Sequence, residues 1–324
     1  MSQRQIDIHR YSMLENDWTI KDGAFISPAL AKKDEDEAEL LIFDEQLRNG
    51  SIRADITILD SGKSEESGDL AKEASLVIRR QEDESCIYAG TGGFGAKFFI
   101  GKMSSAYGGW QPRAEIGRSS SIQMKRVFQL RVDFNGSRIA LYENDVLQRM
   151  IIDQNYQIGQ CGLRTWKTQA RFSNLRILKA QPRAFLIMPF KSELAFVHEV
   201  IEETVSAYGI KCIRADQLSV SRPVMEDVSE QIAEADLVIV DFTDRNPNVY
   251  FEAGMAHAWK KDWIILAQTT DDLTFDVRHI RSVKYSNTMR ADRKLKSDLQ
   301  DAIEALQYQR TPESKKKVSA TDGK

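Results

Sequence analysis

The sequence is poor in the residues that form disulfides and metal sites. Its 324 residues include three cysteines (Cys86, Cys161 and Cys212) and four histidines. The cysteines are odd in number, far apart and outside any CxxC pair, so we expect reduced thiols rather than a disulfide framework. Because no histidines stand at metal-ligand spacing, we expect no metal site.

The sequence also lacks a long apolar run and an excess of basic charge. No stretch approaches the roughly 18 uncharged apolar residues of a membrane-spanning helix, and residues 1–18 lack the apolar centre of a signal peptide. The formal net charge is −3, whereas nucleic-acid-binding proteins usually gather a basic excess on one face. We therefore expect a cytoplasmic protein that binds neither a membrane nor nucleic acid.

The first half of the chain alternates apolar and polar residues, as β-strands do. The alternation is clearest in residues 50–59 and 126–134. Asn135-Gly136 follows the second segment and predicts a tight hairpin, because both residues accept positive φ. Further short strands are expected at residues 40–43, 75–79, 86–89, 97–100, 137–143, 147–152, 161–165 and 170–177. The pattern predicts an all-β sandwich over residues 1–180.

Three motifs of this half also match a known family in their order. They are DGAFIS at residues 22–27, FQLRVDFNGSRIALYEND at residues 128–145 and GQCGLRTWKTQARFSNLRIL at residues 159–178. Together they resemble concanavalin-like, laminin-G-type jelly rolls. The resemblance implies a jelly-roll fold and says less about the ligand. We expect this domain to serve the second half as a sensor or assembly module, with a carbohydrate or a protein signal as its candidate ligand.

Two further features of this half have a functional and a structural interpretation. Tyr107, Trp110 and Trp166 can stack on sugar rings, although core or edge packing is the simpler interpretation of each. The acidic cluster Asp34–Glu39 lacks the glycine and asparagine spacing of a calcium loop, so we interpret it as an acidic surface loop.

The second half alternates continuously apolar runs with helix-like segments. The apolar runs at residues 184–188, 210–214, 237–241 and 263–267 predict strands, and residues 194–208, 223–235, 249–261 and 290–306 predict helices. Apolar strands separated by helices indicate a parallel sheet covered on both faces. We therefore expect a doubly wound, flavodoxin-like α/β domain at residues 181–310, after a linker at residues 179–182. The polar residues 311–324 are expected to be a disordered tail.

Ligands of doubly wound sheets bind beyond the carboxyl ends of the strands. There the predicted strand at residues 237–241 runs into an acidic, amide-rich loop and a new helix. Pro247 suits the first helical turn, and Asn246 or Asn248 can cap it. Glu252 then lies in or just after that turn, where the helix dipole also favours a carboxylate for purely structural reasons. The pattern alone leaves both interpretations of Glu252 open.

Three segments of this half resemble one superfamily. They are FLIMPF at residues 185–190, ADLVIVDFTDRNPNVYFEAGMAHAWKK at residues 235–261 and FDVRHIRSVKY at residues 275–285. They are similar to the nucleoside 2-deoxyribosyltransferase-like proteins, and to the related Toll/interleukin-1-receptor-like effector domains of bacterial antiviral systems. The resemblance implies a homo-oligomeric effector with Glu252 as catalytic carboxylate and Asp236 and Asp241 in contact with ribose or base.

One motif departs from the transferases, which have a glycine-rich loop where this chain has Met188-Pro189-Phe190. We expect the base and phosphate pocket to differ accordingly. The residues expected to contact the substrate are Met188, Pro189, Phe190, Thr243, Asn246, Asn248, Tyr250 and Met255. Lys191, Arg214 and Arg222 are candidate phosphate ligands.

The expected reaction is cleavage of an N-glycosidic bond. Breaking the C1′–N bond builds positive charge on the sugar, and a carboxylate at Glu252 would stabilise that charge or trap it covalently. NAD+ is the leading substrate, and it is consumed rather than used as a cofactor, because nicotinamide leaves without protonation. A deoxynucleotide is second, because its base needs a proton from Asp236 or Asp241. The alternative is a non-catalytic protein that senses a nucleotide.

Overall fold

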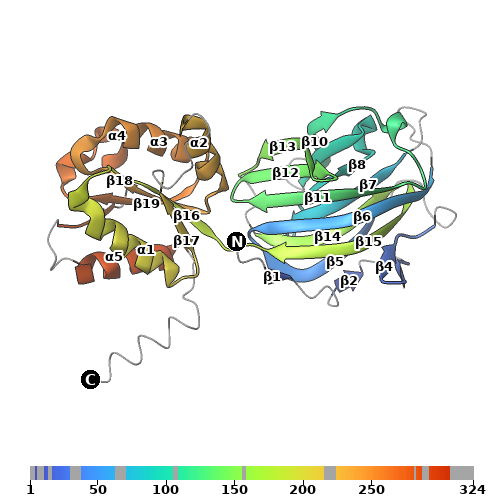
Figure 1. The fold of residues 1–324 in the computed structure, drawn as a ribbon, viewed down its shortest axis with the longest axis horizontal. Coiled ribbons are helices and arrows are strands. Elements are labelled where there is room, and N and C mark those ends of the chain that lie inside the picture. The colour runs from blue at the N-terminus through green and yellow to red at the C-terminus, as the bar shows by residue number, and fades with distance from the viewer. Residues whose placement is uncertain are drawn as a thin grey trace, which may run out of the picture. The chain divides into compact units, whose positions relative to one another are not determined.

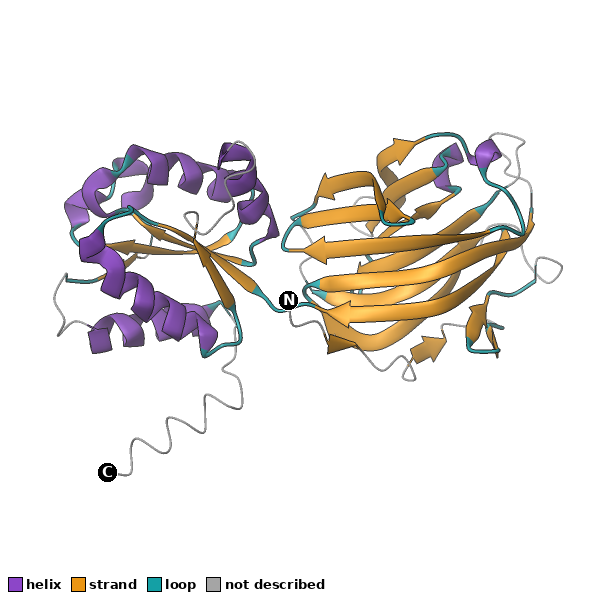
Figure 2. Ribbon diagram, in the orientation of Figure 1, coloured by secondary structure: helices purple, strands orange, loops and turns teal. Residues whose placement is uncertain are grey.

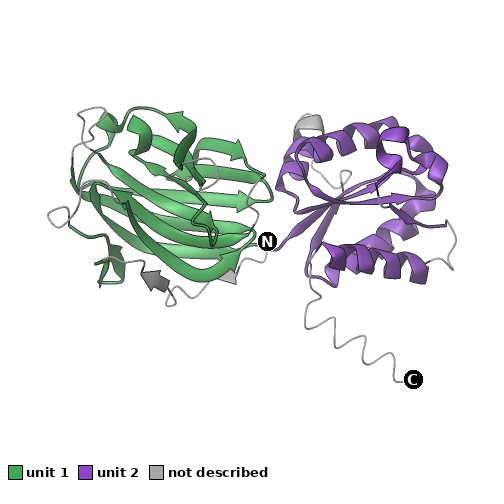
Figure 3. Cartoon of the chain, turned by 180° about the vertical axis from the view of Figure 1, so that it is seen from behind, with its two compact units in different colours: residues 1–180 green, residues 181–324 purple. Residues whose placement is uncertain are grey.

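The computed structural model describes residues 4–5, 11–13, 17–29, 38–62, 71–104, 109–154, 158–214, 224–280, 282–286 and 292–306. The chain divides into two compact units, residues 1–180 and 181–324 (Figure 3). Among the helices in the described ranges, none combines the length and the apolar character needed to cross a bilayer.

The first unit consists of two antiparallel sheets (Figure 1). One sheet has the order β13 (Val146–Ile152), β12 (Arg138–Glu143), β11 (Val127–Asn135), β6 (Gly50–Ser61), β15 (Thr168–Lys179), β4 (Ala24–Ile26) and β3 (Thr19–Lys21), with β1 (Arg4–Gln5) paired to β15. The other has the order β10 (Gly109–Ile116), β9 (Phe98–Ser104), β8 (Cys86–Thr91), β7 (Glu73–Arg80), β14 (Gly159–Trp166), β5 (Ala38–Leu47) and β2 (Tyr11–Met13). Short 3-10 turns lie at Gly93–Gly95 and Ser119–Ser121.

The two sheets share one apolar core, which confirms the predicted β-sandwich. Every second residue of β6, from Ile52 to Ile58, is fully buried. These side chains belong to the same cluster as Leu76 and Ile78 of β7 in the opposite sheet. Because side chains alternate between the two faces of a strand, the period-two pattern of the sequence puts one apolar face of each sheet into this core.

The predicted hairpin is present, with its turn one residue later than expected. Asn135 is the last residue of β11 and pairs with Arg138, so Gly136 and Ser137 form the turn. Gly136 has a φ of 53°, a conformation that glycine adopts without a steric penalty.

Other expectations for this unit need correction. Glu39 is 4% exposed in β5 rather than part of a surface loop, and residues 34–37 lie outside the described residues. The sequence did not predict β1, β2, β3, β4 or β10.

All three cysteines of the chain are free thiols. Burial raises the pKa of each to about 12.

The second unit is a parallel sheet covered by helices on both faces (Figure 2). Its strand order is β17 (Lys211–Arg214), β16 (Arg183–Ile187), β18 (Leu237–Asp241), β19 (Asp262–Ala267) and β20 (Ser282–Lys284). The helices are α1 (Ala195–Ser206), α2 (Val224–Glu234), α3 (Pro247–Ala258), α4 (Phe275–Arg278) and α5 (Asp292–Ala305), and 3-10 turns lie at Ser192–Leu194, Thr243–Arg245 and Thr270–Asp272.

Alternate residues of each central strand enter opposite cores. In β18, Leu237 and Ile239 pack in a cluster with α1 and α5. Val238 and Val240 pack in a second cluster with α2 and α3. A strand buried on both faces is apolar at every position, and this explains the continuous apolar runs from which the parallel sheet was predicted. The short elements β20 and α4 were not predicted, and residues 311–324 lie outside the described residues.

Candidate functional site

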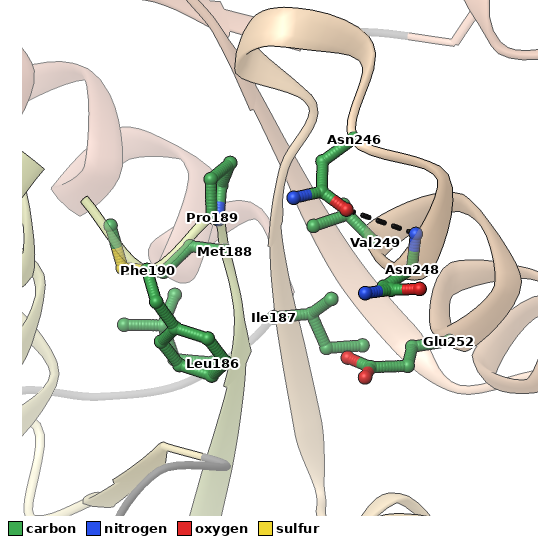
Figure 4. Close-up of a pocket in the computed structure, with 9 residues that line it drawn as sticks. All are labelled: Leu186, Ile187, Met188, Pro189, Phe190, Asn246, Asn248, Val249 and Glu252. Carbon is green, nitrogen blue, oxygen red and sulfur yellow. Dashed lines mark hydrogen bonds between the residues drawn. The ribbon is translucent and has the colours of Figure 1, made fainter.

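A pocket lies at the carboxyl ends of β16 and β18 (Figure 4). Within the sheet, β17, which follows β16 in the chain, lies on one side of β16, and β18 lies on its other side. The crevice at such a reversal of strand order is the usual ligand site of a doubly wound sheet. The pocket has an empty volume of about 310 Å³, including space open to solvent, and is lined by Leu186, Ile187, Met188, Pro189, Phe190, Asn246, Asn248, Val249 and Glu252.

The start of α3 forms one wall of the pocket. Asn246 caps the helix, because its side-chain oxygen accepts a hydrogen bond from the backbone N–H of Asn248 at 2.9 Å. Pro247 occupies the first helical turn, as its missing N–H favours. This cap, which the sequence predicted, fixes where α3 begins and therefore where Glu252 lies. Glu252 is in the second turn, just after the first, and its carboxylate projects from α3 toward Ile187 (Figure 4).

Glu252 sits in a weakly polar environment. Among the nine lining residues it is the one with a charged side chain, and the others are apolar side chains and two amides. Burial raises the pKa of the Glu252 carboxyl above its usual value. A carboxylate that is partly desolvated and unmatched by a lining cation interacts strongly with positive charge placed beside it.

Six of the predicted site residues line the pocket together, namely Met188, Pro189, Phe190, Asn246, Asn248 and Glu252. Leu186, Ile187 and Val249 also line it and were not predicted. Their apolar side chains were assigned to the core, and the sequence gives no sign that they also border a cavity.

Asp236 does not lie at this pocket, contrary to expectation. It precedes β18, and its carboxylate accepts a hydrogen bond from the backbone N–H of Arg183, the first residue of β16, at 2.8 Å. Asp236 is thus at the amino ends of these parallel strands. The five residues of β18 separate it from the carboxyl edge by about 16 Å, at ~3.3 Å per residue. Asp236 is therefore not part of the candidate site.

Asp241 ends β18 at the correct edge, but its carboxylate faces the interior. It is fully buried and accepts hydrogen bonds from the hydroxyl of Tyr285 at 2.6 Å and the hydroxyl of Thr243 at 2.6 Å. The backbone N–H of Thr243 donates a third, at 3.0 Å. Burial raises the pKa of the Asp241 carboxyl, and these hydrogen bonds oppose the rise. Asp241 and Thr243 therefore tie the strand end to the chain after β20, and neither lines the pocket.

Tyr250 and Met255 do not line the pocket either. The Tyr250 hydroxyl donates to the carbonyl of Asp272 and accepts from the N–H of Thr274, and its ring packs 4.5 Å from that of Phe242. Met255 packs against the core between the sheet and α2 and α3. Both were placed at the site because of their nearness to Glu252 in sequence, and the rotation of the helix carries them away from it.

Two of the three candidate phosphate ligands lie beside Phe190, which lines the pocket. The Arg214 guanidinium at the end of β17 lies over the Phe190 ring, 5.8 Å from its centroid. Lys191 forms an ion pair with Asp244 at 2.8 Å between Nζ and Oδ2. Arg222, the third candidate, lies outside the described residues.

In the first unit, two of the three aromatic residues singled out from the sequence, Trp110 and Trp166, contact the protein's own side chains. The Trp110 ring lies 4.5 Å from that of Tyr88, and the Arg164 guanidinium lies 4.3 Å from the Trp110 ring. Lys167 lies over the Trp166 ring at 5.0 Å. Trp110 is 37% exposed and lies on β10, which is an edge strand. Tyr107 lies outside the described residues.

No protein-family model matches the chain, and no curated protein matches it. Solved structures do resemble it. The carbohydrate-binding module CBM66 from Bacillus subtilis is 19% identical, with 52% of this chain and 95% of that chain covered and a TM-score of 0.44. A galectin, LEC-6 from Caenorhabditis elegans, is 12% identical over 50% of this chain and 100% of that chain, with a TM-score of 0.34. The β-glucanase of Bacillus licheniformis is 8% identical over 55% of this chain and 92% of that chain, with a TM-score of 0.36.

Proposed function

We propose that the second unit is a flavodoxin-like domain that cleaves the N-ribosyl bond of a nucleotide, with Glu252 as the catalytic carboxylate. The observation that carries this proposal is the position of Glu252, a partly buried carboxylate in a pocket at the strand-order reversal. Bound nucleotides commonly occupy this place in doubly wound sheets.

The environment of Glu252 suits the charge that this reaction develops. As the C1′–N bond breaks, the sugar becomes oxocarbenium-like, and a carboxylate at C1′ stabilises this charge more than it stabilises the neutral sugar. The apolar walls at Ile187, Met188 and Val249 strengthen the interaction by excluding water. The same carboxylate can form a covalent bond to C1′ that water later cleaves.

NAD+ remains the leading candidate substrate, and the positions of Asp236 and Asp241 support this choice. A purine or pyrimidine needs a proton on its ring nitrogen to leave. Asp236 lies at the opposite edge of the sheet, and both oxygens of Asp241 accept internal hydrogen bonds. Among the described residues, neither predicted acid therefore reaches the pocket. Nicotinamide leaves without this proton, whereas a deoxynucleotide, the second candidate, would need an acid from elsewhere.

The positions of Asp236 and Asp241 also favour one alternative function. With Asp236 and Asp241 outside the pocket, one of the three predicted carboxylates remains at it. A single carboxylate beside two amides also suits a non-catalytic protein that holds a nucleotide through its ribose hydroxyls. In this alternative the second unit is a sensor and the sandwich carries the interaction.

The proposed biological role follows from the resemblance of the second half to antiviral effector domains. The protein would be a homo-oligomeric, cytoplasmic effector of a bacterial defence system that consumes a nucleotide when activated. The β-sandwich would regulate it by binding a carbohydrate or protein signal.

The experiment that tests the proposal is an assay of base release. The full chain is incubated with NAD+, with deoxynucleotides and with nucleosides, and released base is measured by chromatography. We expect nicotinamide release from NAD+. Binding of NAD+ without release, both in dilute solution and at concentrations high enough to favour assembly, would support the non-catalytic alternative.

A further inference from the structure

Asn248 and Glu252 lie on the same side of α3. They are four residues apart, about one helical turn, and side chains at this spacing are neighbours on the helix surface, with Cβ atoms about 5–6 Å apart. Both line the candidate pocket, and Figure 4 shows both on the wall that α3 forms. A ligand whose reacting atom meets the Glu252 carboxylate therefore presents its neighbouring atoms to the Asn248 amide.

The cap of α3 uses Asn246 and Asn248 in different ways. The side-chain oxygen of Asn246 accepts the capping hydrogen bond, whereas Asn248 donates to it through its backbone N–H. The cap thus does not need the side chain of Asn248, which is exposed and lines the pocket. An amide carries donor N–H groups and an acceptor oxygen, so it suits a hydroxyl, which also donates and accepts.

The stereochemistry of a nucleotide indicates which of its groups Asn248 meets. In a β-nucleotide the base occupies one face of the ribose, and the 2′- and 3′-hydroxyls occupy the other. A carboxylate that stabilises C1′ from behind the departing base stands on the hydroxyl face. Because C2′ is bonded directly to C1′, the 2′-hydroxyl is the hydroxyl nearest to the reacting atom, and α3 faces it with both Glu252 and Asn248.

We propose that Asn248 forms a hydrogen bond with the 2′-hydroxyl of the ribose whose C1′ lies at Glu252, and so selects ribonucleotides over 2′-deoxyribonucleotides. The inference rests on the proposed function for the position of C1′. It narrows the substrate class, because NAD+ has this hydroxyl and a deoxynucleotide lacks it. A site that binds a hydroxyl discriminates against the analogue without it, since the polar group of the site then loses its partner.

The test compares NAD+ with its analogue that lacks the 2′-hydroxyl of the nicotinamide ribose. Binding of each to the full chain is measured by calorimetry in the Glu252→Gln background, so that neither ligand is consumed. We expect NAD+ to bind about 3- to 10-fold more tightly, as one neutral hydrogen bond provides. With Asn248→Ala added, the two affinities should come within about twofold of each other.

A third ligand and a second variant serve as controls. For the analogue that lacks the 3′-hydroxyl, the affinity relative to NAD+ should be the same with and without Asn248→Ala. Gln300→Ala removes an amide from α5, which packs on the other face of the sheet, and should leave the preference for NAD+ unchanged. Asn248→Ala should itself fold, because residue 248 keeps the backbone N–H of the cap and alanine is the better helix former.

Equal binding of NAD+ and the 2′-deoxy analogue to the Glu252→Gln protein would overturn the inference, as would binding of neither. A preference that survives Asn248→Ala, or a change in the 3′-deoxy ratio instead, would also overturn it. Base release from NAD+ by the wild type without any preference for the 2′-hydroxyl would reject the inference and leave the proposed function intact. An Asn248-dependent preference without base release would support the inference and reject the enzyme activity.

Discussion

Replacing Asp241 by alanine should destabilise the second unit. The carboxylate accepts hydrogen bonds from the Tyr285 hydroxyl and from both the hydroxyl and the N–H of Thr243, all within 3.0 Å. In Asp241→Ala the two hydroxyls can still bond to each other, because they already lie 3.0 Å apart. The Thr243 N–H and one hydroxyl proton then lose their acceptor inside the protein.

An unsatisfied buried donor costs about 1–3 kcal/mol. The variant also lacks the free-energy cost of desolvating the carboxylate, the burial effect that raises the pKa of Asp241. We therefore expect a net loss of about 2–4 kcal/mol in the free energy of opening of β18. Hydrogen exchange of the β18 amides in the full chain, followed by mass spectrometry, measures this quantity directly. A loss below about 0.5 kcal/mol would refute the structural role assigned to Asp241.

Two further predictions concern the second unit. Because burial raises the pKa of Asp241, the folded chain binds this proton more tightly than the unfolded chain, and wild-type stability falls as the pH rises from the unfolded to the folded pKa. The stability of the wild type relative to Asp241→Asn should therefore be greatest below the ordinary aspartate pKa, fall between that pKa and the raised one, and be smallest above the raised one. Urea unfolding across a pH series checks this, and a relative stability that grew with pH would contradict it. A fragment of residues 181–310 should be soluble and unfold cooperatively, since its two clusters contain only its own residues. Calorimetry that showed no cooperative transition would refute independent folding.

The strands could be predicted from the sequence wherever burial repeats with a simple period along the chain. The strands β6 and β11 alternate between core and solvent, and β18 is apolar throughout because helices cover both faces. The edge strand β10 was missed because neither of its faces is buried and Pro112, beside a bulge, interrupts it. The three-residue β20 is too short to show a period.

The candidate site could be predicted only in part, because strand direction and the rotation of residues around a helix decide which side chains reach it. Glu252 follows a strand and a helix cap, both of which have clear local signals. Asp236 precedes the same strand, and strand direction alone places it at the wrong edge. Tyr250 lies two residues before Glu252 and so points to a different side of α3. The partner of Asp241, Tyr285, is 44 residues away in sequence, and only the fold brings the two together.

The helix glutamates offer a matched pair for testing the mechanism. Glu252 lines the pocket from α3, whereas Glu199 is an exposed glutamate of α1, which packs on the other face of the sheet. Replacement by glutamine keeps the size of either side chain and removes its charge. Neither change should disturb folding, because the helix dipole contributes only about 0.3–1 kcal/mol through such a residue.

The most direct test of the proposed function is the rate of nicotinamide release from NAD+ by Glu252→Gln, beside the wild type and Glu199→Gln. Loss of the carboxylate that stabilises C1′ should lower the rate by at least about 10³-fold, which corresponds to roughly 4 kcal/mol of transition-state stabilisation. Glu199→Gln should match the wild type. A folded Glu252→Gln protein that released nicotinamide at the wild-type rate would contradict the assignment of Glu252 as the catalytic carboxylate.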